Sequence, residues 1–193
     1  MIQFHIDQAG FDGHIKCGTI NYFGGWVVSG EPDRRIAEVK FYVDQECLGR
    51  MPVRQERPDL ERIYQETLLG FASVVDIPDE YLGRNLTLKA VAEDGQEFPL
   101  TEYPLTERLS DAEKDFRREH NLPDDLLIHL VAFQIEPRVF LGEGKAGVDL
   151  IKQILNKHQI SLDALENILD FGTGCGRVLR WWEEHSDRIQ FWG

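Results

Sequence analysis

The sequence predicts two domains of different class, an antiparallel β-sandwich followed by an α/β segment that begins a doubly wound sheet. From residue 15 to about residue 105, short runs alternate apolar and polar residues between turn residues. After about residue 107 the apolar residues recur at helical spacing, and near the end a short apolar run leads into a glycine turn. The 193 residues have room for two small domains, which we expect at residues 1–106 and 107–193.

The strands of the first domain follow from the period of two. Residues 39–43 alternate valine and phenylalanine with polar residues, and a turn then leads to a return strand at 46–51. Residues 86–92 repeat the alternation, and Asp94-Gly95 predicts a two-residue hairpin in which both residues have positive φ. The polar stretch 54–67 predicts a long connection that contains one helical turn.

The second domain opens with a helix. Ser110 and Glu113 have the spacing of a capping box, and Asn121 and Pro123 end the helix. The apolar run 126–133 is consistent with either a helix or a buried strand. A further helix is expected at about residues 145–158, and its apolar stripe is Gly147, Leu150, Ile151, Ile154 and Leu155.

The sharpest local signal is the glycine turn Gly172–Gly176. Ile168–Phe171 predicts a short strand before the turn, and Val178, Trp181, Trp182 and His185 lie on one side of a helix predicted after it. Ligands of doubly wound sheets lie beyond the carboxyl ends of the strands. Glycines permit close approach to the main chain, and the N–H groups of a helix start favour a carboxylate or phosphate. Arg177 stands where a dinucleotide site needs glycine or alanine, which argues against NAD.

The stretch from Ile168 to Arg180 resembles motif I of class I S-adenosylmethionine-dependent methyltransferases. Upstream, Phe140–Gly142, the helix at 147–155 and the turn at 161–165 are similar to the segment that precedes the first strand in such enzymes. The resemblance implies that Asp170 holds the amino group of the cofactor and that the glycines line its methionine and ribose. The cofactor-binding residues that it implies are Asp170, Gly172, Thr173, Gly174, Cys175 and Gly176.

The first domain has a resemblance of its own. Residues 25–30, the strand 39–43, Arg57–Leu60 with Tyr64, and Gly70-Phe71 resemble immunoglobulin-like modules appended to bacterial glycosyltransferases and methyltransferases that act around glycan assembly. This likeness implies an immunoglobulin-like sandwich, and no binding site comes with it.

The methyltransferase resemblance also implies a seven-stranded sheet, of which this chain holds the beginning. In such sheets an acidic residue ~20 positions past the glycine motif, at the end of the second strand, binds the ribose hydroxyls. Asp187 precedes the second strand, Arg188–Trp192, and so lies at its wrong end. We therefore expect the N-terminal part of a methyltransferase, truncated after the second strand and inactive alone. It should expose apolar surface, and either self-associate through the incomplete sheet or leave the residues after about 140 mobile.

In the full enzyme an acceptor would attack the methyl group in line. Modules that resemble the first domain are attached to enzymes of glycan assembly, which indicates a sugar or glycan-linked acceptor. No catalytic residue can be assigned, and His129 in its apolar run fits a core histidine better than a base. The alternative is a non-catalytic module that binds a saccharide or protein partner. Tyr22, Phe23 and Trp26 fit either a sugar-stacking platform or ordinary packing.

The composition of the chain disfavours several classes of partner and site. The formal net charge is -13, which disfavours nucleic acid. Cys17, Cys47 and Cys175 have no metal-ligand spacing, so we expect free thiols, no metal site and a cytoplasmic protein. No apolar run has the length of a membrane span.

Overall fold

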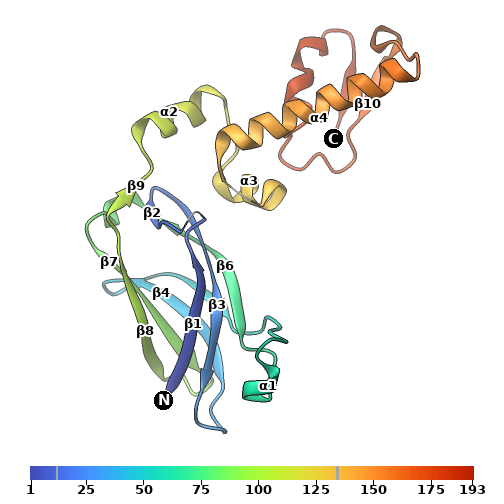
Figure 1. The fold of residues 1–193 in the computed structure, drawn as a ribbon. Coiled ribbons are helices and arrows are strands. Elements are labelled where there is room, and N and C mark those ends of the chain that lie inside the picture. The colour runs from blue at the N-terminus through green and yellow to red at the C-terminus, as the bar shows by residue number, and fades with distance from the viewer. Residues whose placement is uncertain (12, 134) are drawn as a thin grey trace. The chain divides into compact units, whose positions relative to one another are not determined.

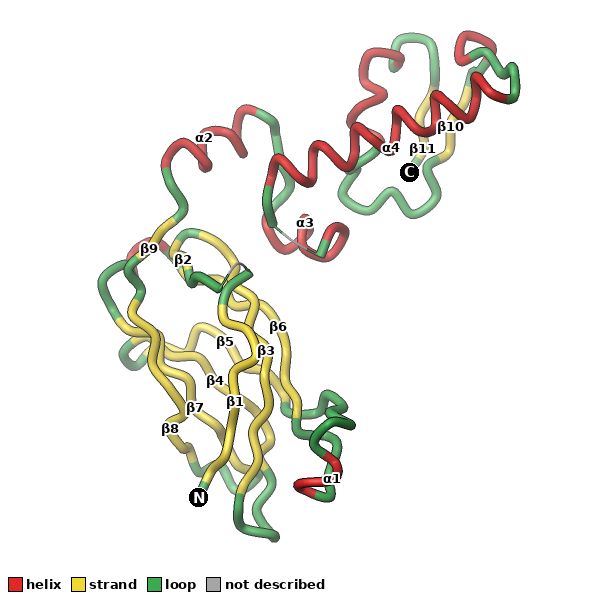
Figure 2. The backbone as a smooth tube through the Cα atoms, viewed as in Figure 1, coloured by secondary structure: helices red, strands yellow, loops and turns green. Residues whose placement is uncertain are grey.

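The computed structural model describes residues 1–11, 13–133 and 135–193. The chain divides into two compact units, Met1–Lys114 and Asp115–Gly193. Strands make up most of the first unit, whereas helices and turns make up most of the second (Figure 2). The division lies within helix α2, Asp111–Glu119, a little beyond the boundary expected at residues 106–107. No helix in the described part of the chain is long and apolar enough to cross a bilayer.

Two antiparallel sheets form the first unit (Figure 1). One has the strand order β1-β3-β6 and the other the order β5-β4-β7-β8. The chain changes sheet between β3 and β4, between β5 and β6 and between β6 and β7, as it does in immunoglobulin-like sandwiches. The predicted sandwich is therefore confirmed. Its strands are β1 (Ile2–Ala9), β3 (Thr19–Ser29), β4 (Ile36–Val43), β5 (Glu46–Pro52), β6 (Gly70–Ile77), β7 (Asn85–Ala92) and β8 (Glu97–Pro104).

Short elements complete this unit. Two two-residue strands, β2 (Lys16–Cys17) and β9 (Glu107–Arg108), pair in parallel. The helical turn expected between residues 54 and 67 is α1, Glu61–Tyr64, and a 3₁₀ turn, η1, covers Asp79–Tyr81.

The core lies between the two sheets and follows the alternation of the sequence. Val39, Phe41 and Val43 on β4 are buried, and the Phe41 ring packs against that of Phe23 on β3 with centroids 4.8 Å apart. Burying each such side chain stabilises the fold by about 1.5–3 kcal/mol. Because the alternate residues face solvent, the outer surfaces of the sheets carry the polar side chains.

The hairpin between β7 and β8 differs from the prediction. Gly95 has φ +85°, but Asp94 does not share the left-handed conformation. The Gly95 N–H donates to the Ala92 carbonyl at 2.9 Å, and the Ala92 N–H donates to the Gln96 carbonyl at 3.0 Å. The connection is therefore a three-residue loop, Glu93–Gly95, in which only the last residue needs positive φ.

The second unit begins in α2, where the capping box is present. The Glu113 N–H donates to Ser110 Oγ at 3.2 Å, and the Ser110 N–H donates to Glu113 Oε2 at 2.9 Å. The run at 126–133 is helical, because Asp124 caps helix α3 by accepting a hydrogen bond from the Leu127 N–H. The remaining elements are α3 (Asp125–Ala132), α4 (Pro137–Lys157), η2 (Leu162–Ala164), β10 (Asn167–Leu169), η3 (Leu179–His185) and β11 (Gln190–Trp192).

Helix α4 is longer than predicted and buries a different face. It begins at Pro137, whose missing N–H is tolerated in the first turn, and Glu136 caps it. Its buried residues include Phe140, Gly144 and Val148, which are four positions apart. The predicted stripe is not buried, because Leu150, Ile151 and Ile154 are exposed.

Candidate functional site

The glycine turn connects β10 to η3, and the chain then returns through β11. β10 and β11 are parallel neighbours, with Asn167 opposite Gln190 and Leu169 opposite Trp192. The segment after the turn was predicted as an α-helix, but it is the 3₁₀ helix η3 and it starts only at Leu179. The unit has the order strand, glycine turn, helical crossover and parallel strand.

The backbone of the turn depends on its glycines. Gly172, Gly174 and Gly176 have φ of +78°, +58° and +75°, in a region that side-chain-bearing residues rarely adopt. Nothing lies within 4 Å of where a Cβ would stand at Gly172 or Gly176, whereas at Gly174 it would lie 2.9 Å from Val131 Cγ2. The turn therefore leaves open space beside two of its three glycines.

Asp170 lies at the carboxyl ends of both strands. Its backbone N–H donates to the carbonyl of Trp192, the last residue of β11, at 2.7 Å. Thr173 Oγ1 is buried without a hydrogen-bond partner, and Cys175 Sγ lies 3.8 Å from the Leu127 carbonyl oxygen. The six residues singled out from the sequence thus lie in one continuous turn just past β10.

Contacts that the sequence did not reveal hold the crossover against α4. Arg177 Nη1 is 2.6 Å from Glu143 Oε2, and the Arg177 carbonyl approaches the Gly144 backbone so closely that a Cβ would lie 2.2 Å from it. Trp182 is buried and stacks on Phe191 of β11, with ring centroids 5.9 Å apart.

The strand before the turn is more exposed than its apolar sequence suggests. The exposed fractions of Leu169 and Phe171 are 70% and 96%. The predicted strand Ile168–Phe171 is in fact β10, Asn167–Leu169, and Phe171 lies in the turn that follows it. The unit thus presents apolar surface at the end of β10 and in the turn, as expected.

The aromatic residues of β3 separate onto two faces. Phe23 is fully buried in the core, so it cannot belong to a sugar-stacking platform. Tyr22 and Trp26 are half-buried on the outer face, where the Trp26 and Tyr64 rings have centroids 5.4 Å apart. Tyr64 donates its hydroxyl to Gln3 Oε1 at 2.7 Å.

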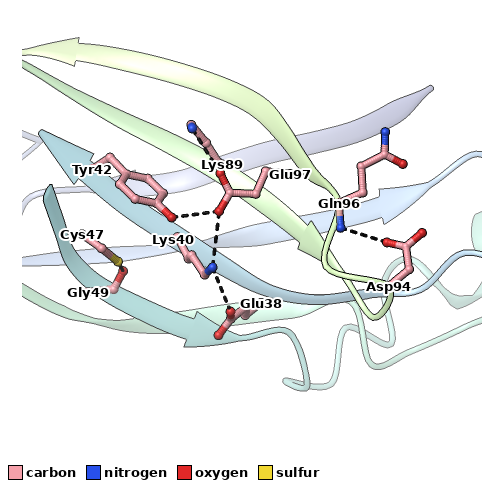
Figure 3. Close-up of polar contacts among 9 residues, drawn as sticks. All are labelled: Glu38, Lys40, Tyr42, Cys47, Gly49, Lys89, Asp94, Gln96 and Glu97. Carbon is pink, nitrogen blue, oxygen red and sulfur yellow. Dashed lines mark hydrogen bonds and ion pairs between the residues drawn. The ribbon is translucent and has the colours of Figure 1, made fainter. Parts of the chain in front are cut away.

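A polar network lies on the exposed face of the four-stranded sheet (Figure 3). The Glu97 carboxylate on β8 accepts from the Tyr42 hydroxyl at 2.8 Å, Lys89 Nζ at 3.1 Å and Lys40 Nζ at 3.3 Å. These hydrogen bonds hold the pKa of Glu97 below its ordinary value, that of Tyr42 being the largest cause. Burial and the bond to Glu97 raise the pKa of Tyr42. Because its members satisfy one another across β4, β7 and β8, the network stabilises the sheet.

A cavity of about 330 Å³ lies at the end of the sandwich where β3 ends and β4 begins. Its charged lining consists of Arg34, Arg35, Arg54, Glu66 and Glu93, and Leu68 supplies part of an apolar wall. The sequence signal for this site is the adjacent pair Arg34-Arg35 in a strongly acidic chain.

Comparisons with known proteins add neither a family nor a function to these observations. No protein family profile matches the chain, and no curated protein matches it. Among solved structures, the fibronectin(III)-like modules of Clostridium thermocellum CbhA are similar, at 13% identity and a TM-score of 0.32, over 56% of this chain and 100% of that one. The strand order of the first unit remains the basis for its description as an immunoglobulin-like sandwich.

Proposed function

We propose that the chain is the N-terminal part of a class I S-adenosylmethionine-dependent methyltransferase, with the turn after β10 as its cofactor site. One observation carries the proposal: a turn with three glycines of positive φ joins two parallel strands through a helical crossover. In such units ligands bind beyond the carboxyl ends of the strands, which is where Asp170 lies.

The residues present fit part of the cofactor. The open space beside Gly172 and Gly176 lets a ligand approach the backbone, and the unpaired Thr173 hydroxyl offers a hydrogen-bonding group beside them. Asp170 would hold the amino group of the methionine moiety, as the resemblance to motif I implies. When bound, the cofactor supplies an electrophilic methyl group, and the role of these residues is to bind and orient it.

The acceptor in this proposal is a sugar or glycan-linked group, and a chain with so much uncovered apolar surface in its second unit would not methylate it alone. Leu169 and Phe171 are exposed, and further strands and helices would cover them in a working domain. Binding of the cofactor to this chain should therefore be weak and confined to the turn.

Amide NMR spectra recorded during a titration with S-adenosylmethionine test this proposal. We expect saturable shifts at the amides of residues 171–177, with Kd in the millimolar range, and at least a several-fold weaker Kd in Asp170→Asn. Asp187→Asn is the matched control, because it removes a carboxylate of the same unit that lies away from the turn. Absence of shifts at the turn, or equal weakening by both variants, would refute the cofactor site.

A second function is proposed for the first unit, a non-catalytic binding role toward a saccharide or protein partner. The observation that favours it is the cavity at the end of the sandwich, which combines apolar wall and charged side chains. Electrophoresis of the chain through gels that contain soluble polysaccharides tests the saccharide form of this role. Retarded migration in at least one polysaccharide supports it, and unchanged migration in acidic and neutral polysaccharides alike contradicts it.

A further inference from the structure

The cavity at the end of the sandwich has the size of a small-molecule site. Its volume of about 330 Å³ lies within the range of ~300–1,000 Å³ that is usual for ligand pockets. It is built entirely from the first unit, from the end of β3, the start of β4, the end of β5, the residues that precede β6 and Glu93 after β7. Its charged side chains therefore stand on connecting segments that adjoin the strand ends.

One of the three arginines that line the cavity is occupied within the protein. Arg34 Nη1 is 3.0 Å from Glu31 Oε1, and its Nε is 3.9 Å from Asp94 Oδ2. The Arg34 guanidinium also lies over the Phe98 ring, 5.2 Å from the centroid. Arg34 thus supports the wall of the cavity and is not available for a ligand.

The other two arginines have fixed backbones and unengaged side chains. The Arg35 carbonyl accepts from the Glu93 N–H at 3.0 Å, and the Arg54 N–H donates to the Gly70 carbonyl at 2.9 Å. Neither guanidinium forms an ion pair or hydrogen bond with any residue in the described ranges, although the chain carries 34 acidic residues. Two guanidiniums on one cavity are suited to a carboxylate, which they bind through charge-assisted, fork-like hydrogen bonds.

The two glutamates of the cavity are also unengaged. Glu66 and Glu93 form no ion pair within the described residues, so neither comes within 4.0 Å of Arg35 or Arg54. The cavity consequently offers separate hydrogen-bond donors and acceptors. Leu68, 49% exposed, adds an apolar wall beside them.

A ligand that satisfies all three features carries a carboxylate for the arginines, hydroxyl donors for the glutamates and a C–H face for Leu68. A sugar acid has this combination, whereas a neutral sugar lacks the carboxylate and a fatty acid lacks the hydroxyls. We propose that the cavity binds a saccharide that bears a carboxylate, such as a uronic acid residue. The inference rests on the binding role proposed for the first unit and is independent of the cofactor site in the second.

The test is an amide NMR titration of the full chain with D-glucuronate, with D-glucose and sodium acetate at equal ionic strength as comparisons. Saturable shifts at the amides of Arg35, Arg54 and Leu68 are expected with glucuronate. Arg35→Gln and Arg54→Gln should each raise its Kd about tenfold, because each removes a charge-assisted hydrogen bond. Arg50→Gln is the control, since Arg50 is an exposed arginine of β5 outside the cavity.

Each of the following results would overturn the assignment. If glucose binds as tightly as glucuronate, the arginines do not recognise the carboxylate. If acetate causes the same shifts, the sugar ring does not contribute to binding. If Arg50→Gln weakens binding as much as the cavity variants do, the attraction is non-specific. A failure of glucuronate to bind, together with retarded migration in a polysaccharide gel, would refute the sugar-acid assignment and leave the binding role. Failure of both experiments would refute the saccharide form of the binding role.

Discussion

Three hydrogen-bond donors converge on the Glu97 carboxylate from two neighbouring strands. Tyr42 and Lys40 lie on β4 and Lys89 lies on β7, so this side chain on β8 ties three strands together. Lys89 Nζ also lies 4.7 Å from the centroid of the Tyr42 ring, which adds a cation–π contact. All three partners are donors, so the full set of hydrogen bonds requires the ionised carboxylate of Glu97.

The variant Glu97→Gln should therefore lower the free energy of unfolding by about 1 kcal/mol at pH 7, an amount typical of hydrogen bonds and ion pairs near a surface. Because the folded pKa of Glu97 is lowered, the stabilisation is present above the unfolded pKa of about 4.3. It is lost as the pH falls through that value toward the folded pKa. Urea unfolding curves of both proteins between neutral and acid pH measure the difference.

The exposed Glu102 on the same strand provides the control, because its side chain takes no part in the Glu97 network. Glu102→Gln should change stability little at any pH. If Glu97→Gln costs as much at acid pH as at neutral pH, the carboxylate charge is not the source of the stabilisation.

The packing of α4 against η3 depends on one glycine of the helix. A Cβ at Gly144 would lie 2.2 Å from the Arg177 carbonyl oxygen and 2.9 Å from Trp181 Nε1. At Gly142, on the same helix, nothing lies within 4 Å. The two positions should thus respond to alanine with opposite signs.

We expect Gly144→Ala to destabilise the second unit by about 1–3 kcal/mol, because backbone atoms must move apart to admit the methyl group. Gly142→Ala should stabilise it by up to about 1 kcal/mol, since alanine favours the helix and meets no atom. Thermal unfolding followed by tryptophan fluorescence compares them, because Trp182 is buried in this unit. Equal effects of the two substitutions would contradict the close approach at Gly144.

The elements that could be predicted are those whose local sequence determines them. The strands of the sandwich follow from alternation, and α2 follows from its capping box. The buried face of α4 could not be predicted, because Phe140, Gly144 and Val148 are selected by what packs against them and not by the hydrophobicity of Leu150 or Ile154.

The same distinction holds at the candidate sites. The turn Gly172–Gly176 is predictable because its three glycines lie in one short run between a strand and a helical segment, and each of them has positive φ. The cavity at Arg35 and Arg54 cannot be predicted from the sequence, because its residues come from separate segments and periodicity gives no information on which guanidiniums lack a partner.

At the scale of the whole molecule, two forces on association oppose each other. The net charge of -13 makes copies of the chain repel, and salt screens that repulsion. The second unit exposes large apolar side chains, which favour association when the repulsion is weakened. They include Leu130, Phe133, Leu169, Phe171 and Trp192.

We therefore expect the chain to self-associate, and to do so more strongly at high protein concentration and high salt. Sedimentation velocity should show the mean mass rising above the 22.3 kDa of one chain as either is increased. The double variant Leu169→Ser and Phe171→Ser should shift the association to several-fold higher concentration, because it removes apolar surface beside the sheet edge. Ile63→Ser, at an exposed position of α1 in the first unit, should leave the association unchanged.

Two outcomes would contradict this prediction. A single boundary of monomer mass at every protein and salt concentration would show that the exposed surface is too small to drive association. Equal effects of the double variant and of Ile63→Ser would place the contact between chains elsewhere.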